Sequence, residues 1–308
     1  MLNYFENHQI DYQKWDECIT HSSEGIIYAL SWYLNLVKPN WEAVIWEKNN
    51  HYVAVMPLPI NRKLGIKHIY QPIFAQQLGV FSTTPLTFEI AQLFINKLNS
   101  EFKYVAKYAF NTQNTGLLNQ ITFKNTETKI WTTHHLDLSK PYVEIHKKYR
   151  IDRKQRLKKA QKANLKLIES ENIKPLIDIF KTNTENKIKG GVSEKTYQIL
   201  ENLHQELVQR KILRLFYVDD LSAGCYFVFY KQKIIYLFNA AKNEARYQNA
   251  RTLILDKIIQ EYAETDYVLD FESPQITTIA DFYASFGAKT SDFYFIAYNR
   301  LPFWIRKA

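Results

Sequence analysis

Apolar and polar residues repeat with two different periods along the chain, and these periods predict its helices and strands. A repeat of about 3.6 residues indicates an amphipathic helix, and a repeat of two indicates a half-buried strand. In the first half the pattern predicts helices over 11–21, 29–37 and 84–101, the last with Thr87 as its N-cap. It predicts strands on both sides of a polar turn at 48–50, a strand that enters a buried loop within 67–81, and strands over 103–111 and 129–138.

The second half repeats this order of elements. The pattern predicts a helix over 144–163, helices over 173–187 and 193–210, three strands within 211–241, a helix over 251–264, a strand over 265–272, a short helix over 279–287 and a last strand over 292–300. Two α+β (α/β) halves of similar order indicate an internal duplication. We expect one domain over 1–134 and a second over 135–308, with one large domain as the alternative that the length leaves open.

Composition places the chain among globular proteins. Hydrophobic residues make up 46% and charged residues 23%, which excludes a disordered chain. Cys18 and Cys225 are predicted to be free thiols in a reducing compartment, although a single bridge between them is also compatible with the sequence. The first residues show no signal peptide, and the longest apolar runs are far below the roughly 18 residues of a membrane span. We therefore expect a cytoplasmic protein without a transmembrane segment.

The positive charge is concentrated in one segment. The chain has 40 Lys and Arg against 31 Asp and Glu, for a net charge of +9. Residues 147–166 contain ten of these cations and one acid, so the remaining residues are balanced, with 30 cations and 30 acids. Such a block predicts contact with nucleic acid, phosphate or a membrane surface.

Two arginines of this segment lie where a solvated charge is not expected. An apolar stripe runs along the predicted helix and contains Arg153 and Arg156. Either both guanidinium groups extend to the rim of the stripe, or they point into a cleft and bind an anion. The stripe itself consists of Ile145, Tyr149, Leu157, Ala160 and Ala163.

Common catalytic and metal-binding motifs are missing. The sequence has no GxxxxGK[ST], GxGxxG, HExxH, CxxC or GxSxG pattern. His134 and His135 fall in a predicted strand and therefore point to opposite faces, which favours one buried and one exposed imidazole. No metal site is predicted.

A resemblance to a known family begins in the last fifty residues. The run ADFYASFGA over 280–288, between two predicted strands, resembles the closing motif of the GNAT acyltransferase superfamily. An LDL strand at 136–138 leads into the run RKQRLKKA over 153–160, within a tandem layout. Together these features resemble the Fem family of peptidoglycan aminoacyltransferases and the related FemAB-like or BioF2-like acyltransferases.

The resemblance implies a fold and a reaction. The fold would be two tandem GNAT-like domains, each with a mixed central sheet flanked by helices. The activity would transfer an acyl or aminoacyl group from acyl-CoA or aminoacyl-tRNA to a small amine or a cell-envelope precursor, with tRNA as a possible partner and no tightly bound cofactor. In GNAT enzymes, a tyrosine at the position of Tyr283 often protonates the leaving thiolate.

The sequence departs from the GNAT pattern in its donor-binding turn. GNAT enzymes hold the pantetheine pyrophosphate on a Gly-rich turn at a helix N-terminus. Residues 242–251 follow the equivalent strand and contain no glycine. The loss fits a donor other than free CoA, and it equally fits a non-catalytic RNA-binding or adaptor module on the same fold. A second departure is Ser273-Pro274, where some FemAB-like sequences have glycine.

Candidate site residues follow from these patterns. Asp270 and Glu272, two residues apart on a strand, are expected on one face, where mutual repulsion and burial would raise one pKa and produce a general base. The alternatives are pairing with a nearby arginine or a surface strand end. Tyr283 is the candidate acid, with a core tyrosine as the alternative. The candidate donor- or phosphate-binding residues are Arg246, Gln248, Asn249, Arg251, Arg153 and Arg156. The candidate acceptor-binding residues are Gln76, Gln77, Tyr70 and Tyr149, although the two glutamines also suit a bridge between the domains.

Overall fold

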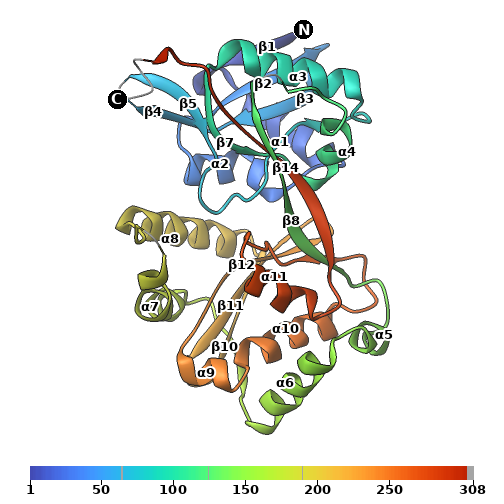
Figure 1. The fold of residues 1–308 in the computed structure, drawn as a ribbon, viewed down its shortest axis with the longest axis vertical. Helices are drawn as coiled ribbons and strands as arrows, with labels where there is room; N and C mark the ends of the chain where they lie inside the picture. Colours follow the sequence, from blue (N-terminus) through green and yellow to red (C-terminus); the bar gives the residue numbers. More distant parts are fainter. Residues whose placement is uncertain (64, 124, 189, 304–308) are drawn as a thin grey trace. The chain divides into compact units, whose positions relative to one another are not determined.

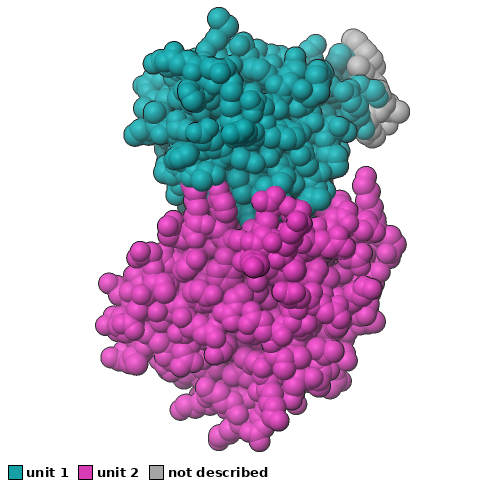
Figure 2. Space-filling view, turned by 180° about the vertical axis from the view of Figure 1, so that it is seen from behind, with its two compact units in different colours: residues 1–131, 292–308 teal, residues 132–291 magenta. Residues whose placement is uncertain are grey.

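A computed structural model describes residues 1–63, 65–123, 125–188 and 190–303. The chain forms two compact units, coloured separately in Figure 2: unit 1 contains residues 1–131 and 292–308, and unit 2 contains residues 132–291. The chain passes from unit 1 to unit 2 after Trp131, close to the predicted domain boundary at residue 134. The last segment was expected in the second domain. Instead, its strand returns to unit 1 and pairs there, with Phe295 opposite Ala109.

Unit 1 contains two sheets. One is antiparallel in the order β1-β2-β3-β6, and the other contains β4, β5, β7 and the second part of β14, with β5 and β7 parallel. Asp11 caps α1 by accepting hydrogen bonds from two backbone N–H groups, and Thr87 caps α3 as predicted. The elements are β1 (Leu2–Phe5), α1 (Tyr12–His21), α2 (Ser31–Val37), β2 (Glu42–Lys48), β3 (His51–Leu58), β4 (Ile60–Lys63), β5 (Ile66–Tyr70), β6 (Phe81–Ser82), α3 (Phe88–Glu101), β7 (Tyr104–Ala109), α4 (Thr115–Leu118) and the first part of β8 (Glu127–Asp137).

Unit 2 is built on one mixed sheet in the order β8-β13-β12-β11-β10-β9. Only β12 and β13 are parallel; the other neighbours are antiparallel. The elements that follow β8 are α5 (Tyr142–Lys147), α6 (Ile151–Lys162), β9 (Leu167–Glu169), α7 (Lys174–Asn183), α8 (Glu194–Gln209), β10 (Leu213–Val218), β11 (Ala223–Tyr230), β12 (Lys233–Ala241), α9 (Asn243–Tyr247), α10 (Ala250–Glu261), β13 (Val268–Asp270), α11 (Thr277–Ala284) and β14 (Lys289–Asn299).

Helices cover both faces of the unit 2 sheet (Figure 1). Residues of α6, α10 and α11 share one buried cluster with Cys225, Phe227 and Tyr236 of the central strands. On the other face Leu176 of α7 packs directly against Gly224, because glycine has no side chain to separate them.

Both cysteines of the chain are free, as predicted, and both are buried. Within the described ranges, no helix is both long and apolar enough to cross a membrane.

The predicted basic helix is two helices. The apolar stripe is correct, since Ile145, Tyr149, Leu157 and Ala160 are all buried. However, the backbone is extended at Arg150, which separates α5 from α6. The extended residue donates its N–H to the carbonyl oxygen of Ser285, so contacts with the last helix of unit 2 replace helical hydrogen bonds. Periodicity alone does not reveal this break.

A buried carboxylate connects α5 to α10. Asp256 accepts hydrogen bonds from the hydroxyl groups of Tyr142 at 2.9 Å and Tyr149 at 3.0 Å. Burial raises the pKa of Asp256, and these two hydrogen bonds oppose the shift. Tyr149, a predicted acceptor-binding residue, is therefore a buried side chain whose hydroxyl is bound within unit 2.

One glycine of unit 1 is fixed by its surroundings. Gly79 has φ of +128°, and a Cβ atom there would lie 2.2 Å from Oδ1 of Asn114. That amide is itself engaged, because Oδ1 accepts from the N–H of Val80 and Nδ2 donates to its carbonyl. Any side chain at this position must break the contact and strain the backbone.

We predict that Gly79→Ala lowers the free energy of unfolding by about 2 kcal/mol or more, because the added methyl group has no room and the backbone angle disfavours it. Gly116→Ala is the matched control: it lies in α4 with no atom within 4 Å of the added Cβ, so it should be neutral or slightly stabilising. Urea denaturation of both variants measures the difference; equal effects would contradict the packing argument.

Candidate functional site

The central strands of unit 2 separate at one point. Parallel pairing between β12 and β13 ends with Ile235 opposite Asp270. Strand β12 continues to Ala241, whereas β13 stops at Asp270. The last part of β12 is therefore paired on one side by β11 alone, and side chains of α10 and α11 approach it on the helical face.

Tyr283 of α11 lies at this separation. Its side chain is only 5% exposed, and its ring stacks on Phe271 and meets Tyr236 edge to face. Burial raises the pKa of Tyr283 well above its ordinary value, and the Arg251 charge and a hydrogen bond from Asn239 only partly oppose this. The hydroxyl is therefore protonated at neutral pH, which is the state that a proton donor requires.

Two further polar residues, Asn239 and Arg251, act on the same hydroxyl, Asn239 by a hydrogen bond and Arg251 by its charge. Arg251, in the first turn of α10, donates from Nη1 to Oδ1 of Asn239 on β12 at 2.6 Å. Asn239 in turn is hydrogen-bonded to Tyr283. We name Tyr283, Asn239 and Arg251 the tyrosine network. It joins α11, β12 and α10 where the two strands separate.

Arg153 is buried, and this corrects the expectation that it reaches the rim. Its side chain is 2% exposed. Nε donates to Oγ of Ser285 at 2.8 Å and Nη1 to Oγ1 of Thr252 at 2.6 Å, while the guanidinium lies 4.2 Å from the ring centre of Phe282 and 4.7 Å from that of Phe286. Burial lowers the pKa of Arg153 to about 10, so it stays charged at neutral pH.

This cation connects three helices around the candidate acid. Arg153 comes from α6, Thr252 from α10, and the two phenylalanines flank Tyr283 in sequence. Arg251 lies over the same Phe282 ring, at 5.5 Å. Arg156, the second arginine of the predicted pair, is exposed, and its charge contributes to the lowered pKa of Arg153. Arg153 is therefore buried and Arg156 exposed, although the helical pattern predicted the same environment for both.

The glycine-free turn contains a short helix and one left-handed residue. Asn249, between α9 and α10, has φ of +60°, a conformation that asparagine tolerates better than most residues. Arg246 donates from Nε to the carbonyl oxygen of Ala241, the last residue of β12, at 3.0 Å. Burial and the Arg251 charge lower the pKa of Arg246. Gln248 is half-buried between the two helices.

Asp270 does not have the raised pKa expected of a base. Its buried carboxylate accepts from Oγ1 of Thr133 at 2.8 Å and from the N–H of Glu272 at 2.9 Å, and it lies 3.1 Å from Nε2 of His135. Burial alone would raise the pKa of Asp270, but the charge and hydrogen bond of His135, aided by Lys233, lower it to about 2. The carboxylate stays ionised and holds β13 to β8.

Glu272 is not on the same strand face as Asp270. The strand was predicted to continue to Glu272, but it ends at Asp270, and Glu272 has φ of +48°. The alternation rule therefore does not apply to this pair. Glu272 is half-buried, and its charge contributes to the raised pKa of Tyr283. Glu272 is thus the carboxylate whose negative charge raises the pKa of Tyr283 in the tyrosine network.

The remaining predicted acceptor residues belong to unit 1. Gln77 is fully buried; its Oε1 accepts from the N–H of Thr112 at 3.0 Å and its Nε2 donates to Oε1 of Gln76 at 2.9 Å. Tyr70 is 46% exposed. These contacts engage both ends of the Gln77 amide within unit 1. Binding of an acceptor by these residues stays a prediction.

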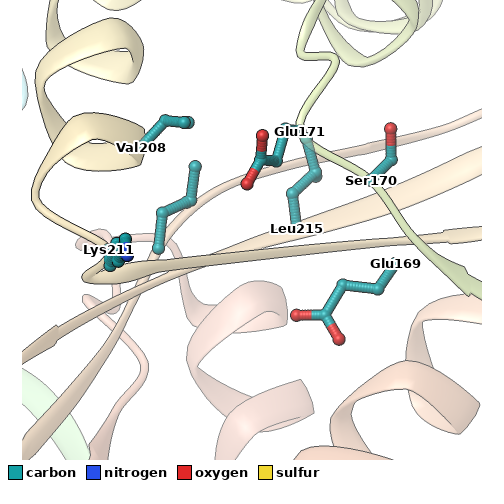
Figure 3. Close-up of a pocket in the computed structure, with 7 residues that line it drawn as sticks. Glu169, Ser170, Glu171, Val208, Lys211 and Leu215 are labelled. Atoms are coloured by element: carbon teal, nitrogen blue, oxygen red, sulfur yellow. The ribbon is translucent and has the colours of Figure 1, made fainter.

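Three surface cavities of about 370, 350 and 320 Å³ are present in the described part of the chain, and the tyrosine network lines none of them. The cavity of about 370 Å³ lies beside β9 and the end of α8 (Figure 3). Glu171 lies between Val208 and Leu215 there, whereas the carboxylate of Glu169 points to the other side of the strand, where Arg214 binds it. Among the described residues, no group of three or more His, Cys, Asp and Glu side chains is placed to hold a metal ion.

Sequence reasoning missed some of the residues that this site brings together. Asn239 is an ordinary polar residue near a strand end, and Cys225 and Tyr236, whose Sγ and hydroxyl lie 3.2 Å apart, resemble core residues. The prediction of one buried and one exposed imidazole is correct for His134, which is buried against Ser273, but His135 is half-buried and faces Asp270. The partners of both come from β13 and the residues after it, about 135 positions away, so local pattern gave no signal.

Comparison with known proteins supports the fold. No protein-family model and no curated protein matches the chain. Among solved structures, FemX superposes with a TM-score of 0.67 at 12% identity, covering 96% of this chain and 98% of that one. A tandem GNAT protein from the clavulanic acid biosynthesis pathway gives 0.53 at 10% identity, with coverage of 98% and 99%. The C-terminal domain of a putative lysylphosphatidylglycerol synthetase from Agrobacterium fabrum gives 0.53 at 8% identity, with coverage of 94% and 91%.

The chain therefore has the tandem GNAT-like fold that the sequence indicated. Its structural neighbours include a Fem-type protein and GNAT proteins along nearly the whole length. At these identities the similarity establishes architecture, and the chemistry must be argued from the side chains.

We predict that Asp270→Asn lowers the free energy of unfolding at pH 7 by about 2 kcal/mol, because it removes a buried carboxylate that is paired and hydrogen-bonded. The folded pKa of about 2 lies below the ordinary value of about 3.9, so this stabilisation is present above pH 4 and is lost as the pH falls toward 2. Denaturation of wild type and variant from pH 7 to pH 2 measures the convergence. Asp266→Asn, at an exposed position, is the control; parallel curves for wild type and Asp270→Asn would contradict the argument.

Proposed function

We propose that the protein is an acyl or aminoacyl transferase whose acyl donor binds in unit 2 where β12 and β13 separate. The observation that carries this proposal is the tyrosine network, in which a buried, protonated Tyr283 is linked through Asn239 to the Arg251 cation. Burial of these polar groups is offset by their mutual contacts, which hold the Tyr283 hydroxyl in a fixed position beside a cation.

The reaction needs one proton to leave and one to arrive. The amine nitrogen of the acceptor attacks the acyl carbon, the new C–N bond forms, and the bond to the sulfur or oxygen of the donor breaks. Tyr283 gives its proton to that leaving atom. Glu272, the half-buried carboxylate whose charge raises the Tyr283 pKa, is the group we assign to accept the amine proton. Asp270 is excluded from this step by its lowered pKa and its three partners.

The donor has a phosphate-bearing part, and arginines surround the place for it. Arg246 and Arg251 stand on both sides of Asn249, at the start of α10, where helix N–H groups favour an anion. Arg156 is exposed and adds positive charge on α6, whereas Arg153 is buried and donates to Ser285 and Thr252. Gln248 and Asn249 are the neutral candidates for this site. Acyl-CoA and aminoacyl-tRNA both carry phosphate, and both remain candidate donors.

The acceptor is an amine, and a cell-envelope precursor is the candidate that the similarity to FemX favours. Gln76, Gln77 and Tyr70 are the proposed acceptor residues of unit 1. The alternative function is a non-catalytic RNA-binding or adaptor module. The basic segment supports it, but it assigns no role to the buried tyrosine network.

We predict that Tyr283→Phe lowers kcat by about a hundredfold to ten-thousandfold, the usual contribution of a positioned acid, with little change in KM. Tyr298→Phe is the control: it removes the hydroxyl of another buried tyrosine, one that donates to the carbonyl of Phe102. Amide formation in an assay with acyl-CoA or aminoacyl-tRNA measures kcat. Equal rates for wild type and Tyr283→Phe would remove the proton-donor role.

Arg251→Gln is expected to weaken donor binding by about tenfold, because a charge-assisted contact to phosphate is lost. The stabilisation of the native state by CoA, acyl-CoA or tRNA, measured by thermal shift, reports this binding. Arg210→Gln, an exposed arginine paired with Glu206 on α8, should leave the shift unchanged. If none of these donors stabilises the wild type, the donor assignment is wrong.

A further inference from the structure

We propose that the outer face of α6 docks the protein on an anionic phospholipid bilayer. The proposal concerns five lysines, which we name the lysine face, together with two exposed aliphatic side chains of the same part of the chain, Ile151 of α6 and Val143 of α5. The lysine face consists of Lys147, Lys158, Lys159, Lys162 and Lys166, all exposed.

Helix α6 separates its cations from its core contacts. Arg153, Leu157 and Ala160 are buried, at spacings that place them on one side of the helix. Lys158 and Lys162 are seven and eleven positions after Ile151, so these three side chains lie along the opposite side. The inward side is fixed by unit 2, and the outward side presents lysines and one isoleucine to solvent.

The charge of this face is not neutralised within the described part of the chain. No ammonium group of the five lysines forms an ion pair or a hydrogen bond there, whereas Arg150 of the same segment binds Asp152 and Asp281. The chain outside residues 147–166 has equal numbers of cations and acids. The long-range field of the protein is therefore that of this segment, and it attracts a negative surface.

The exposed aliphatic residues indicate which negative surface. Ile151 is 77% exposed and Val143, in the first turn of α5, is 64% exposed. Clustered lysines are attracted by anionic lipid headgroups, and an exposed aliphatic side chain adds an apolar contact that a purely ionic partner would not use. The lysines approach the headgroups, and the aliphatic side chains enter the boundary with the acyl chains.

The same segment lacks the features that nucleic acid favours. Single-stranded RNA binds to exposed aromatic rings on which bases stack. The hydroxyl groups of Tyr142 and Tyr149 are both bound to Asp256, and neither ring is an exposed one. All five members of the face are lysines, which act as point charges, rather than arginines, which recognise phosphate through two hydrogen bonds. A lipid surface therefore fits these residues better than RNA.

Membrane docking is independent of the transfer reaction. The face contains no member of the tyrosine network, so a protein that binds vesicles and transfers nothing would refute the proposed function and leave this inference intact. The reverse outcome would refute only the inference.

The test is co-sedimentation of the full chain with vesicles of phosphatidylcholine alone and with one-third phosphatidylglycerol, at about 0.05 M and about 0.5 M salt. We expect binding to the anionic vesicles at low salt and release at high salt. The double variant Lys158→Glu/Lys162→Glu should bind about thirtyfold or more weakly, since each lysine near an anionic surface contributes roughly fivefold. Lys174→Glu/Lys195→Glu, at exposed positions on α7 and α8, makes the same charge change elsewhere and should bind nearly as the wild type does.

Ile151→Ser tests the aliphatic contribution. It should weaken vesicle binding several-fold and leave the salt dependence unchanged, because the charge is the same. Circular dichroism confirms that each variant is folded. The proposal is overturned by any of three results: no binding to anionic vesicles at low salt, equal loss in both double variants, or tighter binding to an unrelated tRNA than to the vesicles with no effect of Ile151→Ser.

Discussion

The site in unit 2 depends on a lock, which is the set of contacts that holds the end of β13 and the residues after it on β8. Asp270 is the centre of the lock, with its carboxylate bound to Thr133 and His135 on β8. The chain stays on β8 beyond it, since Phe271 donates its N–H to the carbonyl of His134 and His134 is hydrogen-bonded to Ser273. Because β8 holds this segment, parallel pairing with β12 stops after three residue pairs. The donor site is proposed at this separation of the two strands.

A second constraint acts from the helical side. Arg153 is a cation in an aromatic environment, which costs free energy unless the charge finds partners. It finds them in two hydroxyl groups and two phenylalanine rings, and these partners belong to α10 and α11. The helix that carries Tyr283 is therefore fixed to α6 by a charge that has no carboxylate partner within hydrogen-bonding distance among the described residues. This arrangement explains how a single arginine couples the basic segment to the candidate acid without touching it.

The basic segment thus has two sides with separate physical roles. Its inward side, with Arg153 and Leu157, belongs to the core of unit 2. Its outward side, with Lys158 and Lys162, belongs to the surface and to the electrostatic field of the whole chain. The net charge of the protein is consequently a property of residues 147–166, whose ten cations include the five lysines of the lysine face.

The resemblance to the Fem family indicated the tandem GNAT-like fold. The sequence pattern by itself determined the order of the elements, the cap at Thr87 and the inward stripe of the basic segment. These features are local, because periodicity, capping and composition act over neighbouring residues. It also offered Tyr283 as a candidate through a short motif, and Arg251 through the glycine-free turn at 242–251. Only the tertiary structure decided that Asn239 joins them, that Asp270 is a fixed carboxylate, that the last strand returns to unit 1, and that Arg153 is buried while Arg156 is exposed. Each of these depends on partners about ten to nearly two hundred positions away, and the pKa of a carboxylate or the burial of a guanidinium is set by those partners rather than by its neighbours in sequence.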